Sequence, residues 1–153
     1  MKTKFHFIIV LILIVLFSCY ACNFAPGSYP YAEKYELKVK ESELVNAIKR
    51  FKEDYPSYSV PPQIQLFDGK SKDIDDHWYH VYFYYQEENQ IIYTWVRQFD
   101  METTSFAFVA VNDGLRLGNW KKINKDFSRK ENKLQKEKFE QRILNEIKKQ
   151  IEK

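Results

Sequence analysis

The spacing of apolar residues changes along the chain, and each change marks a new predicted element. Apolar and charged residues alternate from Tyr35 to Lys40, which is the period of a half-buried strand. From Leu44 onward apolar residues recur every three or four positions, as they do on one face of an amphipathic helix. Ser42 and Pro56 stand where such a helix takes its N-cap and its stop, so we expect a helix between them.

The middle of the chain is rich in aromatic and β-branched residues, a composition typical of β-strands. A polar turn at 86–89 separates residues 78–85 from residues 90–99, and these two segments are expected to form a hairpin. Residues 103–112 are expected to form the next strand, and residues 64–67 a short one after two prolines.

Because side chains alternate between the two faces of a sheet, the sequence also predicts which residues share a face. In the strand at 103–112, Val111 is expected beside Ala107, on the face opposite Phe106 and Phe108. In the first strand of the hairpin, the face with the valine and phenylalanine is assigned to the core: Tyr79, Val81, Phe83 and Tyr85. The outward face then carries a candidate binding surface, which consists of Trp78, His80, Tyr82 and Tyr84.

The C-terminal segment, from about Lys125, contains no proline or glycine and many charged residues. Phe139, Ile143 and Ile147 recur every four residues, which predicts a long helix with one apolar stripe. Together the elements predict an α+β domain: an antiparallel sheet of about four strands, with an N-terminal and a long C-terminal helix packed on one face.

The chain begins with Lys2 and Lys4, followed by an apolar run over residues 7–17. As a helix this run of eleven residues reaches about 17 Å, whereas the hydrocarbon core of a membrane is about 30 Å thick. A basic start followed by a short apolar run is typical of a secretory signal peptide, and the length argues against a membrane-spanning helix.

The end of this run, Leu16-Phe17-Ser18-Cys19, resembles the lipobox of a bacterial lipoprotein signal peptide. The resemblance implies that residues 1–18 are a signal peptide that is removed. It also implies that Cys19 carries acyl chains, palmitate among them, which hold the protein on a membrane.

Cys22 fits the lipobox less well, because Cys19 stands where an aliphatic residue is expected. Tyr20 is not the aspartate that retains some lipoproteins at the inner membrane, so the resemblance implies the outer membrane, facing the periplasm. The expected organisation continues with an acylated tether over residues 19–34, rich in proline and glycine, and a single α+β domain over residues 35–153.

Composition limits the classes of function. The predicted signal peptide holds two of the 24 basic residues and no acidic ones, so the mature chain has 22 basic and 21 acidic residues. A near-neutral protein lacks the positive charge typical of nucleic-acid binding, and we expect no nucleic-acid partner. The sequence contains none of the common motifs of hydrolases, metalloproteases or phosphate-binding loops, so we expect no catalytic residues and no cofactor.

His77 and His80 follow Asp73, Asp75 and Asp76, and such residues can bind a metal ion. Two strand residues three positions apart point to opposite faces, however, so a turn would be needed to bring both imidazoles to one ion. We therefore predict no metal site, and an envelope enzyme or metal-binding protein that uses His77 or His80 stays as an alternative.

Basic residues cluster where the C-terminal helix is expected to begin. A solvated helix face explains them, and a surface that meets anionic lipid headgroups is the alternative. The residues are Lys121, Lys122, Lys125, Arg129, Lys130 and Lys133.

The outward aromatic surface of the hairpin has two explanations as well. Rings that pair across strands stabilise a sheet, and rings of Tyr and Trp also bind proteins, peptides or glycans. The leading functional prediction is a non-enzymatic binding or interaction lipoprotein of the cell envelope, tethered to the membrane, with a protein or glycan as partner. A periplasmic immunity or inhibitor protein that neutralises a toxin or hydrolase is a further alternative.

Overall fold

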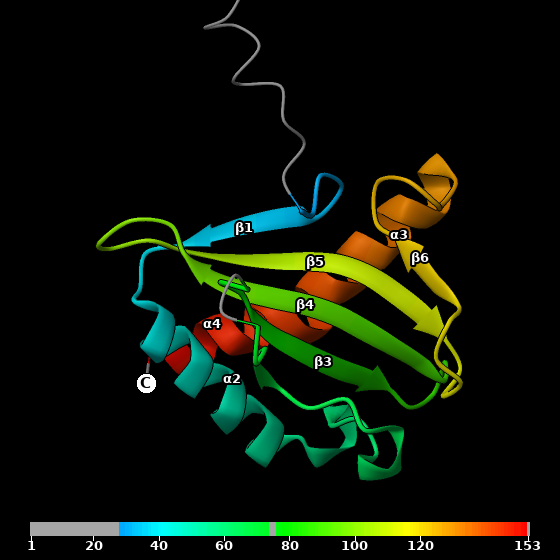
Figure 1. The fold of residues 1–153 in the computed structure, drawn as a ribbon, viewed down its shortest axis with the longest axis horizontal. Helices are drawn as coiled ribbons and strands as arrows, with labels where there is room; N and C mark the ends of the chain where they lie inside the picture. Colours follow the sequence, from blue (N-terminus) through cyan, green and yellow to red (C-terminus); the bar gives the residue numbers. More distant parts are fainter. Residues whose placement is uncertain (1–27, 74–75, 153) are drawn as a thin grey trace, which may run out of the picture. The chain divides into compact units, whose positions relative to one another are not determined.

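The computed structural model describes residues 28–73 and 76–152 of the chain (Figure 1). The chain divides into two units, Met1–Pro30 and Tyr31–Lys153, and every helix and strand below belongs to the second unit. Cys19 and the predicted signal peptide lie outside the described residues. Among the residues that are described, no helix is both long enough and apolar enough to cross a membrane.

The domain is built on one antiparallel sheet of six strands. The strands are β1 Glu33–Leu37, β2 Gly69–Lys70, β3 Tyr79–Tyr85, β4 Gln90–Gln98, β5 Thr104–Asp113 and β6 Trp120–Lys122. They lie in the order β1-β5-β4-β3-β2, and β6 pairs with β5. The α+β class and the antiparallel sheet are confirmed, but the sheet has six strands instead of about four. β2 and β6 have two and three residues, too few to show a hydrophobic period in the sequence.

The strand predicted at residues 64–67 does not form. Pro62–Ile64 is instead a 3₁₀ turn, because proline favours the first position of a helical turn. Gln65 then takes a left-handed backbone conformation with φ of 60°, which interrupts an extended chain, and Phe67 is 69% exposed.

The first long helix, α2 Glu41–Asp54, begins after Lys40 and not at the predicted N-cap Ser42. Lys40 makes no side-chain cap. Glu41 and Glu43 lie in the first turn, where negative charge interacts favourably with the helix dipole. This helix start is therefore stabilised by charge and by Gln98 of β4, whose Oε1 accepts the N–H of Glu41 at 2.7 Å.

The C-terminal helix has three parts: α3 Arg129–Phe139, a π-helical segment Glu140–Leu144, and α4 Asn145–Ile151. It begins at a capping box, in which the Ser128 side chain accepts the N–H of Glu131 and the Glu131 carboxylate accepts the N–H of Ser128. The predicted start near Lys125 is too early, because the N-cap Ser128 has an extended backbone and the helix begins only at Arg129.

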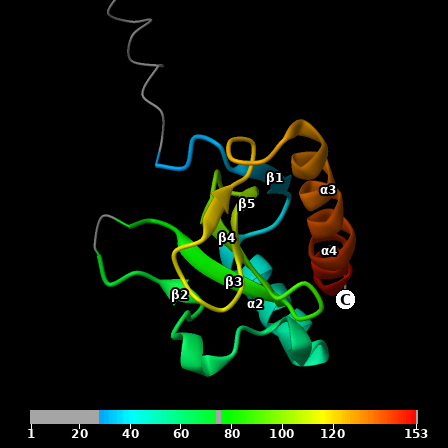
Figure 2. The same ribbon diagram turned by 90° about the vertical axis from the view of Figure 1, so that its right-hand side faces the viewer.

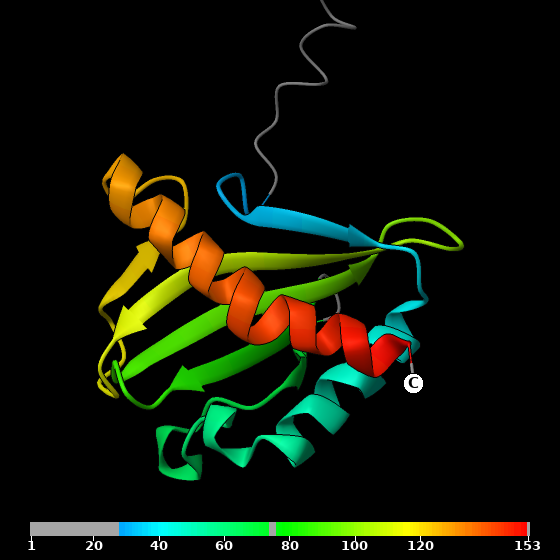
Figure 3. The same ribbon diagram turned by 180° about the vertical axis from the view of Figure 1, so that it is seen from behind.

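The two helices bury their apolar stripes against the same face of the sheet, which we call the inner face. Figure 2 shows α3 and α4 on one side of the sheet, and Figure 3 shows them crossing it beside α2. Phe51 of α2 and Ile147 of α4, each in the apolar stripe of its helix, are fully buried. The ring of Phe139 stacks on that of Phe108 with 4.7 Å between centroids. The inner face is thus the hydrophobic core of the domain.

A β-bulge changes which residues of β5 face the core. The register shifts between Tyr93 and Thr94 of β4, so Val109 of β5 has no pairing partner on β4. The extra residue reverses the alternation along the strand. Val111 therefore lies in the core. The prediction that it lies beside Ala107 is wrong.

The bulge also divides one edge of β5 between two short strands. β1 pairs with residues 104–108 of β5, and β6 pairs with residues 110–112. At the junction the Val109 carbonyl accepts the N–H of Ile123, with 3.0 Å between nitrogen and oxygen. β1, which begins at Glu33, and β6 therefore lie end to end along this edge.

Candidate binding face

The four residues predicted to form a binding surface lie on the outer face of the sheet, opposite the helices. Along β3, half-buried and buried side chains alternate. The buried set packs into the core as predicted: Val81, Phe83 and Tyr85, with Tyr79 at its border. The outward set is half-buried: Trp78, His80, Tyr82 and Tyr84.

Rings from β4 and β6 extend this surface beyond the predicted residues. Tyr93 of β4 stacks on Tyr82, with 5.1 Å between centroids and 16° between the ring planes. Trp120 of β6 meets Tyr93 nearly edge-on at 5.9 Å, and Trp95 of β4 meets Trp78 at 6.4 Å. We call the combined set the aromatic face: Trp78, His80, Tyr82, Tyr84, Tyr93, Trp95 and Trp120.

His80 is the middle member of a chain of polar contacts on the aromatic face. Its Nε2 lies 2.8 Å from Oδ2 of Asp76, and its Nδ1 lies 2.7 Å from the hydroxyl oxygen of Tyr93. Asp76 also accepts the backbone N–H of Trp78 through Oδ1. Desolvation raises the pKa of Asp76, but the hydrogen bonds from His80 and Trp78 outweigh it, and the pKa lies below its usual value.

This arrangement orients rings and does not form a ligand set for a metal. Both ring nitrogens of His80 have polar partners, so a metal ion would have to displace Asp76 or Tyr93. His77 is exposed, and its ring lies 6.3 Å from the ring of Trp78. Over residues 28–73 and 76–152, no three His, Cys, Asp or Glu side chains are grouped as metal ligands.

Two side chains fix the backbone of β3 beneath the aromatic face. Asp68 accepts the N–H of Tyr82 at 3.0 Å, and Lys52 of α2 donates to the Tyr82 carbonyl at 2.7 Å. Lys52 and Asp68 also form an ion pair with each other. Burial lowers the pKa of Lys52, and the charge of Asp68 opposes this shift. β2 pairs only with Tyr79 and His80 of β3, and beyond its end Asp68 and Lys52 bind the backbone groups of Tyr82 that a longer strand would have bound.

A second candidate is a hollow of about 370 Å³ between the β3–β4 turn and the C-terminal helix. Its lining includes Tyr58, Tyr85, Glu88 and Arg142. Arg142 donates to both carboxylate oxygens of Glu88, at 2.9 and 3.2 Å, and its guanidinium lies 5.3 Å from the Tyr85 ring centroid. Glu88 therefore neutralises the charge of Arg142, the cation that lines the hollow. The hollow could not be predicted from the sequence, because its residues come from distant segments that carry no motif.

No model of a known protein family matches the chain, and neither a curated protein nor a solved structure is significantly similar to it. The function is therefore inferred from the side chains. The aromatic face is the stronger candidate, because it gathers more rings than the hollow and lies on the face against which the helices do not pack.

Proposed function

We propose that the protein is a lipid-anchored binding module of the bacterial cell envelope, and that its aromatic face contacts a protein or glycan ligand. The observation that carries the binding role is the aromatic face itself. A sheet with helices on one side needs only one apolar face for its core. Half-buried rings on the other face, such as Tyr82, Tyr84 and Trp120, supply contact area at a low cost in conformational entropy, as in many binding surfaces, whereas Trp95 is only 4% exposed and packs beneath them.

The membrane anchor is proposed from the N-terminal sequence. A basic start and a short apolar run precede the lipobox-like residues Leu16 to Cys19. Acyl chains on Cys19 hold the protein on a membrane, and Tyr20, in place of the aspartate that retains some lipoproteins at the inner membrane, favours the outer membrane, facing the periplasm. Residues 20–30 then connect the acylated cysteine to the domain.

Stacked rings also stabilise a sheet, so binding and stability have to be separated by experiment. Tyr82 and Tyr93 stack face to face, and a pair of this kind contributes about 0.5–1.5 kcal/mol. Tyr84 instead donates its hydroxyl hydrogen to Asn89 in the β3–β4 turn, at 2.9 Å. Tyr84 is therefore the position where the face is probed with the smallest loss of stability.

A photo-crosslinking phenylalanine analogue at position 84 tests the proposal in the intact cell envelope. We expect illumination to give one discrete crosslinked protein or, for a glycan ligand, covalent attachment to the peptidoglycan. The matched control is the same analogue in place of Tyr55, which is 43% exposed at the end of α2 and is not part of the aromatic face.

Adding Tyr82→Ser to the position 84 variant should abolish the product and lower stability only by the loss of one ring pair. Equal crosslinking from positions 84 and 55, or from neither, would contradict the binding role. The crosslinked partner could also prove to be a toxin or hydrolase whose activity this protein blocks. That result would identify the protein as an immunity or inhibitor protein.

A further inference from the structure

Positive charge is concentrated in one short part of the chain, residues 116–133. This stretch contains seven Lys or Arg residues against two Asp or Glu residues, a net charge of +5, whereas the whole chain carries +3. The rest of the chain is therefore net negative. The protein is close to neutral as a whole but strongly polarised.

The fold gathers the basic stretch at one end of the domain, which we call the basic end. It consists of β6, the turn after it and the first turns of α3, which lie side by side in Figures 1 and 3. Four of its basic side chains are exposed and form no ion pair with any described residue: Lys122, Lys125, Arg129 and Lys130.

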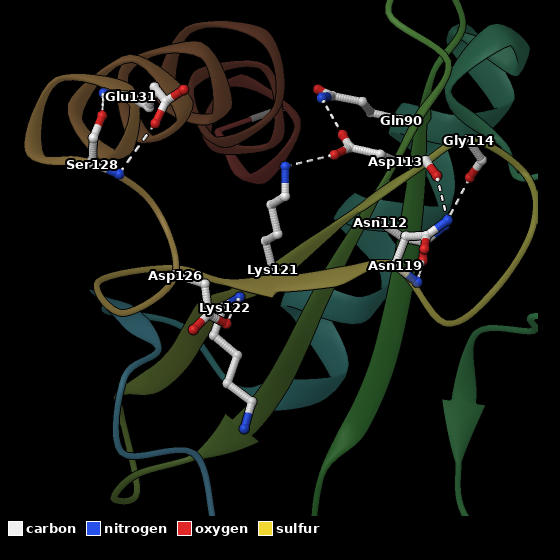
Figure 4. A network of polar contacts seen from close by, with 10 residues as sticks. All are labelled: Gln90, Asn112, Asp113, Gly114, Asn119, Lys121, Lys122, Asp126, Ser128 and Glu131. Atoms are coloured by element: carbon white, nitrogen blue, oxygen red, sulfur yellow. Dashed lines mark hydrogen bonds and ion pairs between the residues drawn. The ribbon is translucent and has the colours of Figure 1, made fainter.

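The nearby carboxylates bind other groups (Figure 4). Asp113 pairs with Lys121 at 2.9 Å. Asp126 accepts the backbone N–H of Lys122, and Glu131 accepts a backbone N–H in the capping box. Figure 4 also shows the Lys122 side chain pointing away from the Lys121–Asp113 pair. The exposed cations of the basic end are thus directed to solvent and not to the chain's own acids.

The polypeptide enters the folded domain beside the basic end. Asn124 donates through Nδ2 to the carbonyl of Tyr31 and to the carboxylate of Glu33, at 3.1 and 2.8 Å. The Lys125 amine lies 5.1 Å from the centroid of the Tyr31 ring, which is 41% exposed. Because Tyr31 is the first residue of the folded unit, any anchor nearer the N-terminus is joined to the domain at this end.

The length of the connection to the anchor and the length of the C-terminal helix favour the basic end as the part of the domain closest to a membrane. An anchor at Cys19 leaves eleven residues, 20–30, which span at most about 40 Å when fully extended. Along the C-terminal helix, Lys148 lies roughly 28 Å from Arg129. The attachment point holds the basic end within the reach of this connection, whereas the far end of the helix can lie roughly 28 Å further from the anchor.

We propose that the basic end lies against anionic phospholipid headgroups of the membrane that holds the acyl anchor. This inference rests on the proposed lipid anchor. Anionic headgroups attract exposed Lys and Arg side chains over about one Debye length, roughly 8–10 Å at moderate salt. A half-exposed tyrosine among lysines, such as Tyr31, is typical of side chains at a membrane interface. The contact gives the tethered domain a defined orientation, with α4 directed away from the membrane.

Lysine labelling of the full-length acylated protein, reconstituted in vesicles, tests the contact. One set of vesicles contains phosphatidylcholine alone, and the other contains equal amounts of phosphatidylcholine and phosphatidylglycerol. With an amine-reactive ester and mass spectrometry, we expect labelling of Lys122, Lys125 and Lys130 to fall several-fold in the anionic vesicles. Labelling of Lys148 should be the same in both, and high salt should remove the protection.

A charge-reversed variant provides the second arm. Arg129→Glu with Lys130→Glu places acids in the first turn of α3, where they favour a helix, so this variant is expected to fold. The remaining lysines of the basic end should then lose their protection in anionic vesicles. Lys49→Glu with Lys148→Glu makes the same change in net charge on α2 and α4, and there the protection should persist.

The two arms separate the contact from the anchor. Equal labelling in both kinds of vesicle, with the protein still floating with the vesicles, would overturn the contact and leave the anchor in place. Loss of flotation with both kinds would overturn the anchor, and the contact with it.

Discussion

His80 joins a carboxylate on one side to a phenol on the other, and this sets the direction in which the Tyr93 ring faces. Tyr93 in turn stacks on Tyr82, so the polar contacts and the ring contacts share one residue. Residues that share a network in this way have non-additive effects when they are substituted. The aromatic face therefore responds to single substitutions as a unit.

Asp76 makes this unit sensitive to acid. Its pKa is lower in the fold than in the unfolded chain, where it is about 3.9. Such a carboxyl adds stability above its unfolded pKa, and the contribution is lost as the pH falls through the folded pKa. Asp76→Asn should lower the urea midpoint at pH 7, and the difference from wild type should close below about pH 4. A difference that stays constant in acid would show that the charge of Asp76 contributes nothing.

Some residues of the aromatic face could be predicted from the sequence and others could not. The difference is whether a residue's position follows from alternation along its own strand. Tyr82 and Tyr84 were placed outward because alternation along one strand is a local property. Tyr93 was accessible to the same reasoning, once the four-residue turn had set the hairpin register. Asp76 comes from the segment before β3, and Trp120 comes through the pairing of β6 with β5, so neither position follows from local periodicity.

At the scale of elements, the packing of the helices on the sheet is the main source of stability. Phe51→Ala and Ile147→Ala should each lower the free energy of unfolding by about 2–5 kcal/mol, because each leaves a cavity in the core. Urea denaturation measures this change. Phe67→Ala is the matched control, since this ring is 69% exposed and its loss should change stability by less than about 0.5 kcal/mol. Unchanged urea midpoints in the two core variants would mean that α2 and α4 do not pack on the sheet through the faces that carry Phe51 and Ile147.

Elements could be predicted from the sequence where their hydrophobic period was long and regular. The prediction failed where a single residue changed the period. The stripes of α2 and α4 were recognised from repeated spacing. The bulge at Val109 adds a residue with no signal in the sequence, and this one insertion moved Val111 to the other face. The prediction of the N-cap was also wrong: Ser42 has the better capping side chain, but the N-cap is Lys40, two residues earlier.

At the scale of the whole molecule, the proposed anchor determines where the domain would work. We predict that Cys19 is acylated and that residues 1–18 are removed, because only this cysteine has suitable lipobox neighbours. A clickable fatty acid should label wild type and Cys22→Ala but not Cys19→Ala. Label that persists in Cys19→Ala and disappears in Cys22→Ala would move the site to the second cysteine.

If the proposed acyl anchor is present, the Lys52–Asp68 pair has a further consequence. An acyl chain confines neighbouring copies to two dimensions and raises their local concentration. An edge strand with open N–H and C=O groups then joins the edge of the next copy, and sheets grow across the membrane. In β3 the backbone groups of Tyr82 are taken by Asp68 and Lys52, and Phe83 forms a bridge with Ser59. Along this edge a neighbouring copy therefore finds few open backbone groups to pair with, and β1, at the opposite edge of the sheet, is the strand where such pairing remains open.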